Sequence, residues 1–409
     1  MSHTQTAPGK SVKPVVFVAN NPAVSFVDLV AVDGQDSGMS RQAIFEASVS
    51  YFLSPIGEFL EDPSVTEVMV NRFDQVFIER AGRLYETEAS FESEDALLSA
   101  VHNVAQWVGR EINLEHPILD ARLPDGSRVH AIIPPGSRQG TCLTIRKFSP
   151  GGLSLDDLIG FGSLSESARE FLEIRVRLHK NIIISGGTGT GKTSLLGAVS
   201  AAVPEEERII VIEDTSELKL RQKHCIYLEV QQPDQYGRGA LNIRQLFVSS
   251  LRMRPDRIIV GEVRGGEALD MVQSMLSGHS GSLSTVHANS SRDALVRLET
   301  LSMMSDVQIP AYVAQAQVAA AIDIVVQLGR FSEDGSRRVT RISEVTGLDR
   351  VANQYLVSDL FVAKMHGKSD DGKLISQLDP TGELPTFSKE PYEHGMDKSI
   401  RLTESLWTR

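Results

Sequence analysis

The chain has 409 residues, 41% of them hydrophobic and 23% charged, which is enough apolar material for more than one sizeable core. Its 53 acidic and 41 basic side chains leave a formal net charge of −12. That balance argues against a protein whose main task is to coat nucleic acid, because such binding needs Lys and Arg to neutralise phosphates. Two cysteines exclude a disulfide scaffold and a four-cysteine zinc site.

The hydropathy of the chain gives no sign of a membrane span or a secretory signal. A span needs about 18 to 20 apolar residues, and the longest apolar stretch, 311–328, is interrupted by Gln315, Gln317 and Asp323. The first residues lack the apolar core of a signal peptide. We therefore expect an acidic, cytosolic-type protein with more than one domain.

The first third of the chain divides into a leader and a small α/β domain. Residues 1–40 mix Ser, Gly, Pro and Asn with short apolar pieces, so we expect a poorly ordered leader. Apolar residues at helical spacing predict a helix over 43–60, and Ser93 is expected to cap a second helix. Runs of β-forming residues occur at 65–70, 75–79, 121–123, 128–133 and 142–148. These patterns predict an N-terminal α/β domain over 41–148.

The remainder of the chain has a different pattern of predicted secondary structure, in which strands alternate with helices. Ser149-Pro150-Gly151-Gly152 has the composition of a hinge, so we assign 149–160 to a linker and 161–409 to a second domain with a C-terminal extension. Strands are predicted at 181–185, 208–212, 226–230, 257–260 and 282–286, and helices at 194–202, 243–253, 267–276 and 292–304. Val/Ile-rich strands separated by helices indicate a parallel sheet covered on both faces. After Asp323 the pattern changes to short β pieces, with a turn at Asp334-Gly335.

Residues 186–193, GGTGTGKT, match the phosphate-loop pattern G-x-x-x-x-G-K-[ST], after an apolar strand and before a helix. The glycines let backbone N–H groups converge on phosphate oxygens, and the helix N-terminus adds positive potential. Lys192 is expected to reach the β- and γ-phosphates of a nucleoside triphosphate, and Thr193 to hold Mg²⁺. A dinucleotide site is excluded because Lys192 stands where a third glycine is needed. The predicted binding residues are Gly186, Gly187, Thr188, Gly189, Thr190, Gly191, Lys192, Thr193 and Ser194.

Glu262 follows the predicted buried strand 257–260, at the end of the strand where ligands bind in open α/β sheets. A carboxylate there can position or deprotonate a water in line with the γ-phosphate, which typically contributes about 10² to 10⁴ in rate. The alternative is a surface glutamate that begins a helix. The phosphate loop in the same domain favours the catalytic role.

A second acidic stretch, Glu213-Asp214-Thr215-Ser216-Glu217, follows the strand 208–212. Carboxylates near a triphosphate suit water-mediated coordination of Mg²⁺, since this ion keeps several waters and takes few protein oxygens. We expect this role for Glu213 ahead of Asp214 and Glu217. The alternative is that Asp214 caps the next segment and Glu213 is solvated.

Two histidines, His279 and His287, lie eight residues apart around a short predicted strand in GHSGSLSTVHAN (278–289). No cysteine is near and no glutamate lies at metalloprotease spacing, which disfavours a metal site. An isolated histidine is more often a structural residue. We expect instead that both histidines sense the γ-phosphate by donating hydrogen bonds to it.

Four motifs combine here: the phosphate loop, the pair Glu213-Asp214, the segment 251–264 (LRMRPDRIIVGEVR) and the histidine segment. This combination resembles the secretion-superfamily ATPases, the hexameric motors of type II and type IV secretion and of type IV pili. Within the superfamily the chain is most similar to the CpaF/TadA branch, which powers tight-adherence (Flp) pilus assembly. Further matching sequence motifs lie in the N-terminal part of the chain, at 65–71, 76–80, 120–129 and 145–148. The resemblance covers about residues 45–365. Arg72 stands where the family pattern has glycine, and the four-Cys motif of type II relatives is absent here, as it is from this branch.

The resemblance implies a RecA-like P-loop domain hinged to a smaller N-terminal α/β domain, with ATP at their junction. Arg122, Arg128 and Arg146 match family arginines that reach the γ-phosphate; the alternative is that some of them pair with Asp120 or Asp125. The family further implies Mg²⁺-dependent ATP hydrolysis by a homo-hexamer. Such a motor is cytoplasmic, docks peripherally on inner-membrane platform proteins without entering the bilayer, and needs no nucleic acid.

Three rival functions remain open. Within the family, the chain could be a conjugation or effector-secretion ATPase. A RecA-type nucleic-acid motor would need a basic, aromatic-bearing track, and the 6% aromatic content and the acidic balance disfavour it. A nucleotide-gated scaffold without hydrolysis is disfavoured by the intact Lys192, Thr193, Glu262 and His287.

Overall fold

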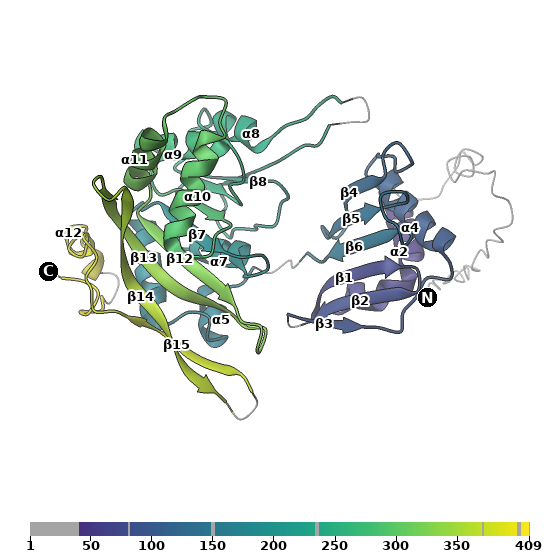
Figure 1. Cartoon of the computed structure of the whole chain (residues 1–409), viewed down its shortest axis with the longest axis horizontal. Helices are drawn as coiled ribbons and strands as arrows, with labels where there is room; N and C mark the ends of the chain where they lie inside the picture. The colour runs from purple at the N-terminus through teal and green to yellow at the C-terminus, as the bar shows by residue number, and fades with distance from the viewer. Residues whose placement is uncertain are drawn as a thin grey trace, which may run out of the picture. The chain divides into compact units, whose positions relative to one another are not determined.

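The computed structural model describes residues 41–80, 82–148, 152–233, 237–369, 372–398 and 402–408, with side chains from residue 46 onward. The predicted leader and the hinge residues Ser149-Pro150-Gly151 lie outside these ranges. Two separate β-sheets organise the described chain, one of six strands and one of nine (Figure 1).

The six-stranded sheet is antiparallel throughout, in the order β3-β2-β1-β6-β5-β4. Its strands are β1 (Val65–Arg72), β2 (Gln75–Arg80), β3 (Arg83–Glu86), β4 (Ile118–Arg122), β5 (Arg128–Ile132) and β6 (Cys142–Arg146). Alternate side chains point inward, as expected for strands with one covered face. They pack with α4 (Glu94–Trp107) in one hydrophobic core. The Ser93 hydroxyl accepts a hydrogen bond from the N–H of Ala96, which confirms the predicted cap.

The single helix predicted over 43–60 is wrong. The structure has three pieces, α2 (Arg41–Phe52), the 3₁₀ turn η1 (Ser54–Ile56) and α3 (Gly57–Glu61). Pro55 explains the break, because proline lacks an N–H and disfavours helical geometry in the residue before it. Strand β3 was not predicted, since all four of its side chains are exposed and give no alternation of apolar and polar residues.

The nine-stranded sheet has the order β15-β14-β13-β12-β7-β11-β10-β8-β9. Its strands are β7 (Ile182–Gly186), β8 (Ile209–Glu213), β9 (Cys225–Glu229), β10 (Arg257–Val260), β11 (Leu283–Val286), β12 (Ile324–Arg330), β13 (Arg337–Asp349), β14 (Gln354–Lys368) and β15 (Leu374–Pro380). The six strands from β12 to β9 are parallel, which confirms the predicted parallel sheet. The last three strands pair antiparallel and extend it.

The short β pieces predicted after Asp323 are wrong in length, because β13 has 13 residues and β14 has 15. Register shifts interrupt their pairing at Ile342/Ser343 and at Val345/Gly347. Each irregularity changes which side chains face inward, so a two-residue period does not persist along the sequence. The predicted turn at Asp334-Gly335 does lie between β12 and β13.

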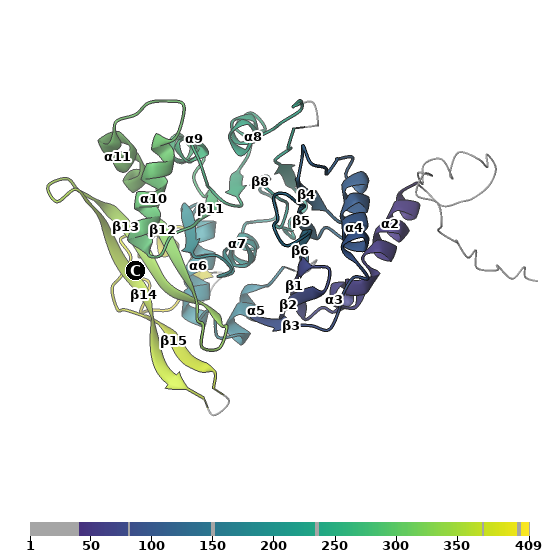
Figure 2. The same cartoon turned by 45° about the vertical axis from the view of Figure 1, so that its right-hand side comes forward.

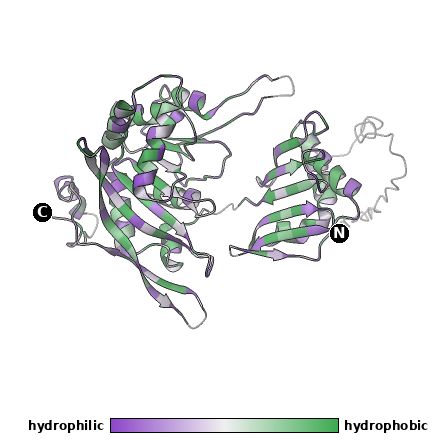
Figure 3. Ribbon diagram, viewed as in Figure 1, coloured by the Kyte–Doolittle hydropathy of each residue, from purple (hydrophilic) through white to green (hydrophobic). Residues whose placement is uncertain are grey.

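Helices cover both faces of this sheet, as predicted. On one face lie α5 (Leu155–Gly160), α6 (Glu166–Arg177) and α7 (Lys192–Ser200); on the other lie α8 (Ile243–Ser250), α9 (Glu267–Leu276), α10 (Ser291–Met303) and α11 (Ala311–Ala321). The last three gather on the same face in Figures 1 and 2. Neighbouring strand residues serve different cores: Ile182 and Ile184 pack with α6 and α7, and Ile183 packs with the opposite helices. Figure 3 shows hydrophobic residues on both the strands and the helices, with hydrophilic residues between them.

The longest apolar stretch of the sequence proves to be helix α11 followed by strand β12. None of the helices in the described ranges has the length and apolar character to cross a bilayer.

Past β15, the described chain continues through α12 (Glu390–Glu393) and η2 (Met396–Lys398) to Thr408 and packs against α6. One carboxylate oxygen of Glu170 accepts hydrogen bonds from the N–H of Thr403 (2.8 Å) and from Nε1 of Trp407 (2.9 Å). The guanidinium of Arg175 is fully buried, 3.4 Å from the ring centre of Phe387 and 5.0 Å from that of Trp407. Burial lowers the pKa of Arg175 to about 9. We call these five side chains the α6–tail contact.

The α6–tail contact predicts a large stability loss on truncating Trp407. Trp407→Ala removes a 2%-exposed indole from a core and leaves Glu170 and Arg175 with fewer partners. We expect the free energy of unfolding, measured by urea titration, to fall by about 3 to 5 kcal/mol. Tyr312→Ala, which truncates an aromatic side chain that is 72% exposed, is the control and should change it by less than about 0.5 kcal/mol. Equal effects would show that the tail does not stabilise α6.

Candidate active site

The loop after β7 has the geometry of a phosphate cradle. Gly189 (φ 67°) and Gly191 (φ 91°) both adopt left-handed backbone conformations that favour glycine. Gly191 is also the N-cap of α7, and it has no side chain to bond the first N–H groups of that helix. A helix N-terminus open in this way suits an anion, because free N–H groups and the helix dipole both attract negative charge.

Lys192 begins α7 and folds back over the loop. Its ammonium group donates hydrogen bonds to the carbonyl oxygens of Gly186 (3.1 Å) and Gly187 (3.0 Å). Burial lowers the pKa of Lys192, while the negative charge of Glu262 favours its protonated form. Thr193 and Ser194 follow in the first turn of α7, and Thr188 and Thr190 lie within the loop. All nine predicted binding residues therefore lie on one continuous strand–loop–helix segment.

Glu262 lies at the carboxyl edge of the same sheet. The backbone on both sides of it is fixed: Gly261 N–H donates to Ile212 O (2.8 Å) and Val263 N–H donates to Thr285 O (3.0 Å). Strand β11 separates β10 from β7, so at about 4.8 Å per strand the two strand ends are about 10 Å apart. That spacing leaves room for a phosphate and a water between Lys192 and Glu262, and the structure brings these two predicted residues to one site.

Glu213 ends β8 and is only 3% exposed. Its carboxylate accepts hydrogen bonds from the N–H groups of Glu217 (3.0 Å) and Leu218 (3.1 Å), and so fixes the acidic stretch onto the strand. Burial raises the pKa of Glu213 to about 7, although the two backbone hydrogen bonds act in the opposite direction. Gly261 makes room for this side chain, because a Cβ there would lie 3.0 Å from Glu213 Cγ. The alternative of a solvated Glu213 is thus wrong, and the expected role of Glu213 at Mg²⁺ stays a prediction.

The two histidines lie at opposite ends of β11. His287 follows the carboxyl end of the strand, on the side of the phosphate loop, and is exposed. His279 precedes the amino end, where Leu283 pairs with Ile182 at the start of β7. The four-residue strand alone separates the two ends by about 10 Å. The prediction that both histidines reach one γ-phosphate therefore needs correction, because the structure does not bring His279 to the phosphate loop of its own chain.

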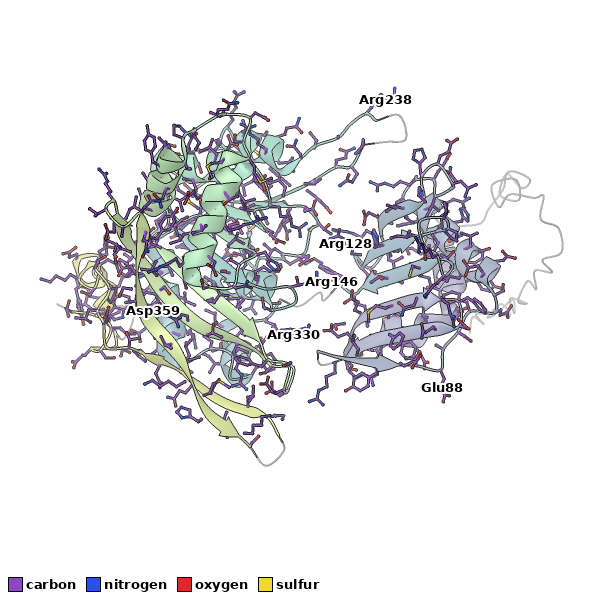
Figure 4. The ribbon with its side chains drawn as sticks, viewed as in Figure 1. Glu88, Arg128, Arg146, Arg238, Arg330 and Asp359 are labelled. Carbon is purple, nitrogen blue, oxygen red and sulfur yellow. The ribbon has the colours of Figure 1, made fainter. Side chains whose placement is uncertain are left out.

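The three predicted arginines lie on the six-stranded sheet. Arg128 and Arg146, labelled in Figure 4, are register partners on β5 and β6, and Arg122 ends β4. Arg122 pairs with Glu229 (2.7 Å) and Arg146 pairs with Glu217 (3.3 Å). Arg128 lies 3.9 Å from Asp120, the partner that the sequence left open as an alternative. Their contact with a γ-phosphate stays a prediction.

Comparison with known proteins places the chain in a family. A model of the type II/IV secretion system proteins matches residues 52–360. The chain belongs to this family. A putative conjugal transfer protein of Mycobacterium tuberculosis is 32% identical over 325 residues, which are 78% of this chain and 90% of the relative. The type IV secretion system protein PtlH of Bordetella pertussis is 34% identical over 317 residues, which are 72% of this chain and 94% of the relative.

Among solved structures, the DotB ATPase of Yersinia pseudotuberculosis has a similar fold, with a TM-score of 0.52 at 16% identity over 77% of this chain and 82% of that one. The RecA-like α/β fold implied by the family resemblance is confirmed, and the protein is a secretion ATPase. The resemblance to the superfamily is confirmed as well. The names of these relatives fit the type IV secretion and conjugation alternative, and the CpaF/TadA branch remains a proposal.

This secretion ATPase carries three further cations at the site that the sequence did not reveal. Arg264 pairs with Glu262 (2.7 Å) and with Asp214 (3.3 Å). Nε of Arg337, on β13, donates to the carbonyl oxygen of Gly189 (2.8 Å). Arg330, on β12 and labelled in Figure 4, lies so close that a Cβ on Gly189 would be 3.0 Å from its Nη1. Of these three, Arg264 alone could have been noticed from sequence, because it lies two residues after Glu262. Arg330 and Arg337 reach the loop from β12 and β13, which follow it by more than 130 residues and lie beside it only through sheet pairing.

The burial of Glu213 predicts a pH-dependent stability. Because the pKa rises from 4.5 to about 7 on folding, the unfolded carboxyl ionises first, and stability falls as pH rises between these values. Above pH 7 the cost is about 3 kcal/mol. Glu213→Gln keeps a carbonyl acceptor for the two N–H groups and removes the titration. We expect urea titrations to show the variant gaining about 3 kcal/mol relative to wild type between pH 4.5 and 7.5. The exposed Glu206→Gln is the control, and parallel pH curves for wild type and Glu213→Gln would contradict the assignment.

Proposed function

We propose that this secretion ATPase hydrolyses ATP in an Mg²⁺-dependent reaction at the carboxyl edge of its nine-stranded sheet. In this proposal Lys192 binds the β- and γ-phosphates and Glu262 positions or deprotonates the attacking water. The observation that carries this proposal is the shared edge of the sheet, because the phosphate loop and Glu262 follow strands separated only by β11. The negative charge of Glu262 also favours the protonated form of Lys192 and so opposes the lowering of its pKa by burial. A triphosphate between them would meet a cation on one side and a base on the other.

The residues at the start of α7 fit a magnesium nucleotide. Thr193 stands in the first turn next to Lys192, where its hydroxyl would hold the ion, and Glu213 would contribute through water because its oxygens already accept backbone N–H groups. A bound Mg²⁺ supplies positive charge that offsets the charge of the phosphate oxygens. We assign His287, at the carboxyl end of β11, as the residue that senses the γ-phosphate.

We further propose that Arg122, Arg128 and Arg146 approach the γ-phosphate and that the active form is a homo-hexamer. A planar guanidinium supplied from a second sheet would let one phosphate influence the orientation of both. Support comes from the arginine positions on adjacent strands and from the family match. Native mass spectrometry with a non-hydrolysable ATP analogue tests the assembly: six copies support the ring, and a persistent monomer contradicts it.

The work that the hydrolysis drives is the assembly of a tight-adherence type pilus in our first proposal, with the motor in the cytoplasm, docked on inner-membrane platform proteins. The N-terminal and central motifs of the sequence support this branch. A specific observation favours a second candidate, conjugation or effector secretion: the relatives carry the names conjugal transfer protein and type IV secretion system protein. Deleting the gene in its host separates them. Loss of surface pili supports the first, and loss of DNA or effector transfer with normal pili supports the second.

The site assignment predicts two different defects. Lys192→Ala should abolish ATP hydrolysis because the phosphates lose their cation. Glu262→Gln should still bind ATP but turn over about 10² to 10⁴ times more slowly, because an amide is a poor proton acceptor. The release of phosphate measures the rate of ATP hydrolysis by each variant. The binding of a fluorescent ATP analogue measures the affinity of each variant for nucleotide.

Two exposed residues outside the site provide the controls for these variants. Lys223→Ala and Glu206→Gln remove the same charges from the surface and should hydrolyse ATP at the wild-type rate. Wild-type turnover by Lys192→Ala or by Glu262→Gln would show that the site is assigned to the wrong residues.

A further inference from the structure

The guanidinium of Arg264 joins two acidic strand ends. Its Nη2 lies 2.7 Å from Glu262 Oε2, and its Nη1 lies 3.3 Å from Asp214 Oδ2. Glu262 follows β10 and Asp214 follows β8, two neighbouring parallel strands. One planar group therefore connects the proposed catalytic carboxylate to the acidic stretch beside it.

The backbone that carries Arg264 is itself held in place. The buried carboxylate of Glu267, at the start of α9, accepts hydrogen bonds from the N–H groups of Arg264 (2.7 Å) and Gly265 (2.8 Å). Charge-assisted bonds of this kind are stronger than neutral ones. The arginine thus extends from a fixed point, and its side chain reaches two fixed strand ends.

The backbone and the side chain of Glu262 are constrained very differently. The flanking N–H groups are bonded to β8 and β11, which fixes the Cα position. The side chain is 25% exposed and has several rotatable bonds, so its carboxylate can adopt more than one orientation. Binding of Oε2 by Arg264 selects one orientation and leaves Oε1 for another partner.

We propose that Arg264 is a positioning residue, which holds the carboxylate of Glu262 in the orientation required for activating water. The inference rests on the proposed role of Glu262. Asp214 assists from the other side: it occupies Nη1, offsets the charge of the guanidinium and turns its other terminal nitrogen toward Glu262. Arg264 acts through Glu262 and makes no contact with substrate in this proposal.

The position of Arg264 makes a clean test possible. Its side chain is 57% exposed, and exposed ion pairs contribute little to stability. Arg264→Gln should therefore fold like the wild type. Thermal unfolding of each variant checks this before any rate is compared.

The main experiment measures kcat and KM for ATP in Arg264→Gln. We expect kcat to fall about 10- to 100-fold, because a small misplacement of a reacting group has effects of this size. The KM for ATP, and the affinity for a fluorescent ATP analogue, should stay within about threefold, because ground-state binding is not changed. Arg264→Lys should recover part of the rate, since a lysine can reach one carboxylate but cannot bridge both in a plane.

Asp214→Asn tests the second half of the bridge. It should lower kcat less than Arg264→Gln does, and the double variant should be no slower than Arg264→Gln alone, because the two residues act along one chain of contacts. Arg297→Gln on α10, which removes an exposed guanidinium away from these strand ends, is the control and should match the wild type.

Several results would overturn the proposal. Unchanged kcat in Arg264→Gln would show that Glu262 needs no such partner. A rise in KM with constant kcat would make Arg264 a direct phosphate ligand, and a rise in kcat would make it a restraint on hydrolysis. Glu262→Gln separates this failure from failure of the proposed function: a slow Glu262→Gln with a normal Arg264→Gln leaves the site assignment intact and rejects only the role of Arg264.

Discussion

The parallel pairing of β7, β11, β10 and β8 is the constraint on which the site depends. Strands that run in the same direction end at the same edge, so the phosphate loop, Glu262 and Asp214 meet there although they are far apart in the sequence. The pairing also fixes the direction of each side chain. A shift of β10 by one residue would turn the side chains that face one core toward the other core. The buried Val/Ile runs therefore determine the chemistry indirectly, by fixing the register of the polar residues that follow them.

The distribution of charge at this edge complements that geometry. Two cations bond the backbone carbonyl oxygens of the phosphate loop: Lys192 donates to those of Gly186 and Gly187, and Arg337 donates to that of Gly189. These carbonyl oxygens therefore repel a bound phosphate less. The N–H groups at the start of α7 are left without a side-chain cap. The first of the antiparallel strands, β13, thus contributes a cation to the phosphate loop through Arg337.

Sequence reasoning succeeded where a local pattern determines the structure. The loop from Gly186 to Thr193 has a fixed spacing and context, and the strand before Glu262 is a continuous apolar run, so both could be placed. It failed for His279, because motif proximity says nothing about which end of a strand a residue occupies. Arg330 and Arg337 could not be found either, since their approach to Gly189 depends on long-range pairing of β12 and β13. The buried state of Glu213 follows from its contact with Gly261, which again is tertiary.

The chain contains two tryptophans, and the structure assigns them to different cores. Trp107 ends α4 and packs on the core of the six-stranded sheet, whereas Trp407 is buried between the tail and α6. Trp407 also stacks on Phe171 with 9° between the ring planes, beside a buried guanidinium, so its surroundings differ from those of Trp107. Each sheet therefore has its own tryptophan reporter. Replacing either indole by phenylalanine leaves a single-tryptophan protein, in which selective excitation of the indole follows one sheet without a label.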